Sequence, residues 1–237
     1  MARKPTAPTE PGGDADRRKI VDAFLALLAE RNYEDVGLTD VASRAGVPLH
    51  RCRGEFDSLI GVLAAFLEET DQKVLAGIDK DMAEEPARER LFDVLMRRLE
   101  ALTPHREAIR SLSRSARCNP PLALALNGLA VRSQRWMLAA ADIDTAGLRG
   151  SFRAQGLACL FADVVRVWLN DEDPGLARTM AALDRQLGRG ARWARGLDDL
   201  CRLLPNPCRI VSRLRPRDRH YDDRRHDDHG GEQPAVV

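Results

Sequence analysis

Three arginines stand close together in the stretch VASRAGVPLHRCRGEF, which covers residues 41–56. Arg44, Arg51 and Arg53 carry guanidinium groups, and guanidinium groups neutralise and bind phosphate. At helical spacing, three such groups predict a contact with one half-site of double-stranded DNA, because the local field around a DNA-reading segment matters more than the net charge of the domain. In the alternative interpretation, the same arginines only solvate an exposed face.

Other residues of this stretch oppose a DNA contact. The segment that would enter the groove carries Cys52, Gly54 and Glu55, and an unpaired carboxylate facing phosphate weakens binding. Residues 17–71 contain seven basic and ten acidic side chains, a net charge of −3. Whether the segment still binds DNA therefore stays open at the level of sequence.

The elements that would position these arginines are short helices. Apolar residues at helical spacing predict a helix over residues 16–31, which Asp16 can cap. Thr39 can cap a second helix, Gly46 supplies the tight turn after it, and Pro48 suits the first position of a third. A long fourth helix is expected after Asp57 or Ser58. These elements predict a helix-turn-helix headpiece over residues 17–65, which follows a disordered, Pro- and Gly-rich arm over residues 1–16.

The remaining pattern is helical as far as residue 196. Pro104 and the Asn-Pro-Pro at residues 119–121 separate successive helices, and no alternation typical of strands occurs. With 44% hydrophobic residues, the chain can bury a sizeable core. We therefore predict an all-α protein in which residues 66–196 form a helical domain for ligand binding and dimerisation. The candidate lining of an apolar ligand cavity is Leu95, Leu99, Ile109, Leu112, Leu126, Leu129, Met137, Leu160 and Phe161.

The last two strong helices, residues 151–171 and 174–195, carry small side chains beside Leu and Val. Small residues permit close helix approach and predict a homodimer contact, whereas the plainer interpretation is an intramolecular core. The candidate dimer residues are Gly156, Ala158, Ala162, Ala181 and Ala182.

Catalysis and metal chemistry find no support in the sequence. The five cysteines include no CxxC pair and are interpreted as small buried residues of a reducing compartment. The five histidines form no recognisable nucleophile motif, and neither a glycine-rich phosphate loop nor HExxH occurs. We expect a protein that is not an enzyme and that needs no cofactor and no metal.

The N-terminal region resembles the TetR family of regulators, on the segments AERNY, LTDVASRAGV and EF with Ser58 beyond them. The resemblance implies a TetR-like fold, a homodimer built through a four-helix bundle, and an operator-binding headpiece. Where the family usually has a phosphate-binding tyrosine this chain has Arg53, and where it usually has a lysine this chain has Leu59.

The C-terminal half resembles a second family, the lipid-binding accessory protein of ubiquinone biosynthesis, ninth of the coenzyme Q set, on RVWLNDEDPGLARTMAALDRQL and the basic segment after it. That family implies an isoprenoid lipid in the cavity and a contact with the membrane. Residues 188–219 contain nine arginines and three aspartates, a net charge of +6, which suits an anionic membrane surface. The candidate surface residues of the amphipathic segment 197–217 are Leu200, Arg202, Leu203, Leu204, Arg209, Ile210, Arg213 and Leu214.

Two functions follow as expectations. The first is a transcriptional regulator that binds DNA as a homodimer and senses an apolar small molecule. The alternative is a lipid-binding accessory protein that does not bind DNA. We expect a cytoplasmic location for the first and a peripheral position at the inner membrane surface for the second. Residues 218–237 are expected to form a disordered tail.

Overall fold

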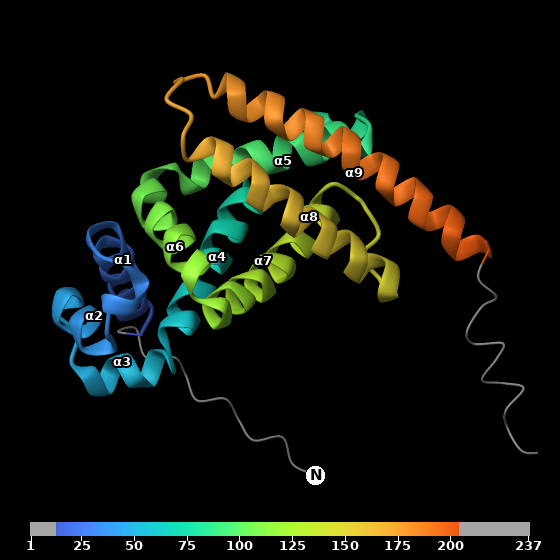
Figure 1. The fold of residues 1–237 in the computed structure, drawn as a ribbon. Coiled ribbons are helices and arrows are strands. Elements are labelled where there is room, and N and C mark those ends of the chain that lie inside the picture. Colours follow the sequence, from blue (N-terminus) through green and yellow to red (C-terminus); the bar gives the residue numbers. More distant parts are fainter. Residues whose placement is uncertain (1–12, 204–237) are drawn as a thin grey trace, which may run out of the picture. The chain divides into compact units, whose positions relative to one another are not determined.

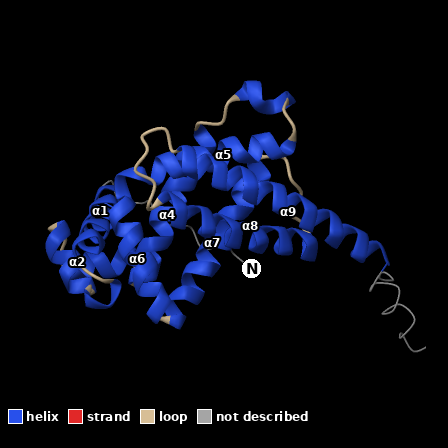
Figure 2. Ribbon diagram, turned by 45° about the horizontal axis from the view of Figure 1, so that its top comes forward, coloured by secondary structure: helices blue, strands red, loops and turns tan. Residues whose placement is uncertain are grey.

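The computed structural model describes residues 13–203, and it describes side chains for residues 13–190 except residue 80. Every regular element in this part of the chain is a helix, which confirms the all-α prediction (Figure 2). Three short 3-10 segments lie at Tyr33–Asp35, Lys80–Glu84 and Thr103–His105. The α-helices are α1 (Gly13–Glu30), α2 (Leu38–Ala45), α3 (Leu49–Glu55), α4 (Leu59–Ala76), α5 (Ala87–Leu102), α6 (Arg106–Cys118), α7 (Pro120–Ala140), α8 (Gly147–Trp168) and α9 (Ala177–Leu203).

The chain divides into two compact units, which meet between residues 195 and 196. Of the second unit, the structure describes residues 196–203, the last residues of α9. Helix α9 thus includes the first residues of the predicted amphipathic segment 197–217, and the predicted domain bounds stay a prediction.

Helices α1, α2 and α3 gather at one end of the first unit, and α4 runs from them toward the remaining helices (Figure 1). One face of α1 is buried, with Ile20, Phe24 and Leu28 at 1% exposure or less. Burial of each such side chain stabilises the fold by about 1.5–3 kcal/mol. The headpiece is thus held together by an apolar core that leaves α3 at the surface.

The larger part of the first unit contains α5, α6, α7 and α8, and its core includes Leu95, Leu99 and Trp168, all fully buried. Side chains also join α7 to α8, since Asn127 and Gln155 exchange two hydrogen bonds of 3.1 and 2.9 Å. This reciprocal pair fixes the register of the two helices on one side of the pocket described below.

Some helix ends differ from the sequence-based expectation. Ser58 caps α4, because its Oγ accepts a hydrogen bond from the Gly61 N–H at 3.1 Å. The sequence had predicted either Asp57 or Ser58 at this position. The prediction for Thr39 is wrong: α2 begins at Leu38, and the Asp40 carboxylate accepts from the Gly37 N–H at 2.9 Å. Asp16 is also not a cap, because α1 begins three residues earlier.

Candidate nucleic-acid interface and ligand pocket

The turn between α2 and α3 depends on Gly46. Its φ of 64° lies in the left-handed region, which glycine adopts without the steric cost of a side chain. The Gly46 N–H donates to the carbonyls of the last turn of α2, and Val47 is buried directly after it. Pro48 precedes the first residue of α3. This geometry is a helix-turn-helix, as the sequence predicted.

In the seven-residue helix α3, Cys52 is buried, whereas the exposed residues are Leu49, His50, Arg51, Arg53 and Gly54. The Cys52 thiol lies 3.8 Å from the Val47 carbonyl, and burial raises its pKa. A Cβ atom placed on Gly54 would meet nothing within 4 Å. The exposed face of α3 therefore carries the guanidinium groups of Arg51 and Arg53, and it has no side chain at Gly54.

Each of the three candidate DNA-binding arginines already lies against a carboxylate of this chain. Arg44 donates to both oxygens of Glu30 at 2.9 and 2.6 Å. This bidentate hydrogen bond raises the pKa of Arg44 and lowers that of Glu30. The Arg53 guanidinium donates to Asp57, four residues along the chain.

Arg51 differs from the other two because its partner is buried. Its Nη2 lies 2.5 Å from Oδ2 of Asp16, whose side chain is 11% exposed. That oxygen has close contact with Arg51 but no hydrogen bond of good geometry among the described residues. We interpret the contact as a charge pair that joins α3 to α1. Sequence reasoning assigned the arginines without these acids, and only the spacing of Arg53 and Asp57 could have revealed one of them.

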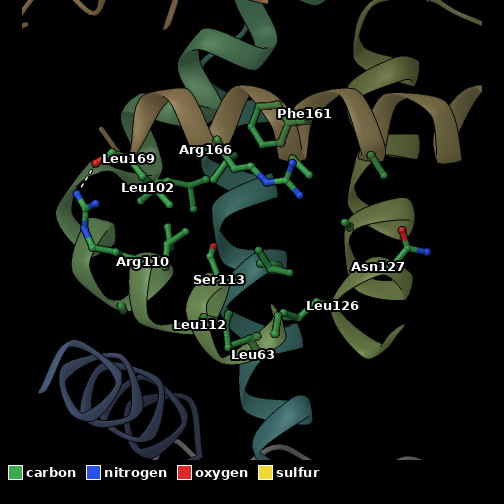
Figure 3. A pocket seen from close by; sticks show the side chains of 18 of the residues that line it. Leu63, Leu102, Arg110, Leu112, Ser113, Leu126, Asn127, Phe161, Arg166 and Leu169 are labelled. Carbon is green, nitrogen blue, oxygen red and sulfur yellow. Dashed lines mark hydrogen bonds between the residues drawn. The ribbon is translucent and has the colours of Figure 1, made fainter. Parts of the chain in front are cut away.

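A pocket of about 820 Å³ lies in the first unit, among α1, α4, α5, α6, α7 and α8. Figure 3 shows Leu63, Leu112 and Leu126 on one side of it and Phe161 and Arg166 projecting into it from α8. Arg110 closes one end, where its guanidinium donates to the Leu169 carbonyl. A pocket of this volume suits a small organic molecule.

The structure brings together four of the nine residues predicted to line a cavity: Ile109, Leu112, Leu126 and Phe161 all line this pocket. The other five do not. Periodicity identifies a buried face, but it cannot separate a cavity wall from a packed interface. The five residues that pack elsewhere are Leu95, Leu99, Leu129, Met137 and Leu160.

A buried polar network borders the pocket. Arg98, 3% exposed, donates from Nη1 to Oδ1 of Asp71, and the Ser133 hydroxyl donates to the same oxygen at 2.7 Å. The Arg98 guanidinium also lies 5.8 Å from the centre of the Phe161 ring. Sequence reasoning missed this network, because its members come from three different helices, α4, α5 and α7, and only the fold brings them together.

Helix α6 is both a wall of the pocket and a neighbour of the headpiece. The Ser111 hydroxyl donates to the Arg31 carbonyl at 2.7 Å, directly after α1. The Ser115 hydroxyl accepts from the Tyr33 N–H at 3.1 Å. The Asn119 amide donates to Glu34 at 3.1 Å, which lowers the pKa of that carboxyl. These three hydrogen bonds connect the pocket wall to the segment between α1 and α2.

The predicted dimer residues divide into two groups. Gly156, Ala162 and Ala181 are exposed, whereas Ala158 and Ala182 are buried within the protomer at 4% and 5%. Ala158 and Ala162 also line the pocket. Ala158 and Ala182 are therefore unsuited to a contact with a partner, because the chain's own helices already cover them.

The predicted membrane-surface residues fall at or beyond the limit of the described chain. Leu200, Arg202 and Leu203 belong to the end of α9, in the part where side chains are not described. The other five, Leu204, Arg209, Ile210, Arg213 and Leu214, lie outside the described residues. No helix between residues 13 and 203 has the length and apolarity needed to cross a bilayer.

The cysteine prediction was wrong at two positions. Cys52 is buried, but Cys118 and Cys159 are exposed, all as free thiols. Within the described part of the chain, no three His, Cys, Asp or Glu side chains gather as a metal site would require.

Solved structures of TetR-family transcriptional regulators share this fold. The regulator from Nitrosomonas europaea matches with a TM-score of 0.58 and 24% identity, over 77% of this chain and 99% of that one. Regulators from Syntrophomonas wolfei and Rhodococcus sp. RHA1 match with TM-scores of 0.54 and 0.53 at 16% and 20% identity. They cover 78% and 76% of this chain and 97% of their own chains. No protein-family model and no curated protein sequence matches the chain. The fold is therefore TetR-like and all-α.

Proposed function

We propose that the chain is a one-component transcriptional regulator, which binds operator DNA as a homodimer and senses a largely apolar small molecule. The observation that carries the proposal is the double role of α6. This helix lines the pocket, and it hydrogen-bonds the headpiece through Ser111 and Ser115, with a further hydrogen bond from Asn119 directly after it. The structures that share the fold are described as transcriptional regulators, which supports the same function.

Binding in the pocket would act on the headpiece through these hydrogen bonds. A ligand that displaces α6 moves the side chain that forms each of these hydrogen bonds. The segment between α1 and α2 must then move with α6, or the hydrogen bonds break. A ligand shifts such an equilibrium only by its difference in affinity for the two arrangements. In this proposal, the bound arrangement of α6 differs from the one that presents α3 to DNA.

The arginines differ in their suitability for DNA contact. Exposed ion pairs contribute about 0–1 kcal/mol, so Arg53 and Arg44 can exchange their carboxylates for phosphate with little loss. Arg51 cannot do so equally well, because buried Asp16 would lose its counter-charge. Arg53 is therefore the contact that we expect to matter most, and Arg51 chiefly positions α3.

Retention of the full chain on duplex DNA tests the regulator. We expect binding at moderate salt, weaker binding for Arg53→Ala, and a salt dependence that is flatter by about 0.9 in log–log slope. The matched control is Arg132→Ala, an exposed arginine of α7. Glu55→Lys should tighten non-specific binding. If the chain shows no retention even at low salt, the regulator proposal is wrong.

A second candidate is a lipid-binding accessory protein that works at the membrane surface without DNA, the alternative given by the second resemblance. The pairing of Arg44, Arg51 and Arg53 with carboxylates of the chain favours it, since paired arginines offer less positive charge to phosphate. Flotation with vesicles that contain anionic lipid distinguishes the two. The full chain should float if residues 197–217 bind the surface, and a chain that ends at Arg195 should not.

A further inference from the structure

The first turn of α1 lies directly against α3. Oδ2 of Asp16 is 2.5 Å from the Arg51 guanidinium, and the Arg17 guanidinium lies over the Phe56 ring, 4.7 Å from its centre. Phe56 is the residue at which α3 ends. Two consecutive residues of α1 thus contact this helix, one within it and one at its end. The start of α1 is therefore a neighbour of the helix-turn-helix.

The next two residues of α1, Arg18 and Lys19, are basic and exposed. Neither forms an ion pair, a hydrogen bond or a ring contact with a residue whose side chain the structure describes. Because a helix rises about 1.5 Å per residue, both lie within one turn of the contact with α3. Two cations without a partner among these residues therefore stand beside α3.

The acids nearest in sequence do not compensate this charge. Asp14 and Asp22 lie four residues before and four residues after Arg18, the spacing at which helical ion pairs form. Among the described residues, neither of them pairs with Arg18 or Lys19.

The candidate DNA-binding arginines of the helix-turn-helix differ in this respect. Arg44, Arg51 and Arg53 each lie against a carboxylate of the chain. An arginine paired in this way adds less to the positive potential around the protein, because the two charges offset each other at a distance. The uncompensated positive charge beside α3 is therefore supplied by α1.

We infer that Arg18 and Lys19 bind the phosphate backbone of duplex DNA beside the groove that α3 enters. The inference rests on the proposed DNA binding and adds a contact from outside the helix-turn-helix. Lysine and arginine neutralise phosphates whatever the base sequence, so this contact supplies affinity and orientation, not sequence preference. It gives a headpiece whose α3 carries Glu55 a source of attraction for a polyanion.

The salt dependence of DNA binding by the full chain tests the inference. The variant Arg18→Gln with Lys19→Gln should bind duplex DNA more weakly, and the loss of two phosphate contacts should flatten the log–log slope by about 1.8. The advantage of the unsubstituted chain over this variant should then shrink about ten-fold when the salt rises from 50 to 200 mM. The loss should be equal for a duplex that the chain prefers and for one of random sequence.

The matched control is Arg31→Gln with Arg132→Gln, which removes the same net charge from two exposed arginines. Arg31 follows the opposite end of α1, about 18 Å along the helix from Lys19, and Arg132 lies on α7. The control should bind DNA as the unsubstituted chain does, and both double variants should keep its urea midpoint.

The outcomes separate the two proposals. If the unsubstituted chain binds DNA but the test variant keeps its salt slope, or loses no more affinity than the control, the phosphate contact of α1 is wrong and the regulator proposal stands. If the unsubstituted chain does not bind duplex DNA even at low salt, both proposals are wrong.

Discussion

The guanidinium of Arg51 in α3 lies 2.5 Å from the buried carboxylate of Asp16 in α1. The contact crosses from the first helix of the headpiece to the third. It therefore contributes to the position of α3, in contrast with the exposed pair of Arg53 and Asp57, which lies within one short segment.

Arg51→Ala should lower the free energy of unfolding by about 1–3 kcal/mol, because it leaves a buried acceptor without its partner. Arg53→Ala, in which both partners are exposed, should change it little. Urea denaturation followed by circular dichroism measures both variants. Equal stability of the two would contradict a positioning role for Arg51.

The buried network of Asp71, Arg98 and Ser133 should show strong coupling. Arg98→Ala should destabilise the protein by about 3–5 kcal/mol, since it leaves an uncompensated buried charge. The double variant Arg98→Met with Asp71→Leu should lose less, because it removes both charges and keeps most of the volume. A double-mutant cycle with the singles Arg98→Met and Asp71→Leu checks this, and additive losses would show that the pair is not coupled.

The hydrogen bonds to Asp171 predict that the stability of the fold decreases at acid pH. Hydrogen bonds from the Thr179 hydroxyl at 2.6 Å and the Thr179 N–H at 2.9 Å lower the pKa of this buried carboxyl. Because the pKa of Asp171 is lower in the folded protein than in the unfolded chain, its ionised form stabilises the fold. This stabilisation is fully present above the pKa of the unfolded chain, about 4, and is lost as the pH falls from there through the pKa of the folded protein. Thr179→Val should therefore reduce this acid-dependent loss, measured as urea midpoints from pH 6 to pH 3.

The control for that experiment is Thr39→Val, an exposed threonine of α2, which should retain the dependence of the unsubstituted chain. An identical acid profile for Thr179→Val and Thr39→Val would contradict the role of the Thr179 hydroxyl.

The proposed homodimer makes a prediction at Ala181, which is exposed on α9. Ala181→Arg should give a monomer by light scattering, because a long charged side chain there would separate the two copies. Ala139→Arg on the exposed side of α7 is the matched control and should leave the mass unchanged. Ala182 is unsuitable for this test, since it is buried within the protomer and its replacement would disturb folding.

Local rules predicted most of the helices. Gly46 acts through its backbone conformation, and Ser58 through a hydrogen bond to a residue three positions away. Both effects are local, so the sequence alone predicts them. Helix starts were less predictable: Thr39 is a good capping residue, but Asp40 hydrogen-bonds to the Gly37 N–H and the helix begins earlier.

The candidate site was less predictable because tertiary contacts define it. Arg51 and Asp16 are 35 positions apart in the sequence, and only folding brings their charges together. Likewise, Leu99 and Leu112 are both apolar residues on helices, but the first is fully buried in the core and the second lines the pocket. A sequence pattern gives the side of a helix that is buried, not what lies against it.

Gly54 has a consequence for the motion of α3. A glycine within a helix costs about 1 kcal/mol relative to alanine, and around this one there is open space that a methyl group would fill without a clash. Such a cost makes local opening roughly five-fold more frequent, so the backbone amides of α3 should exchange with solvent correspondingly faster. Gly54 thus lets α3 open more often than an alanine at the same position would, and a bound partner would slow that exchange.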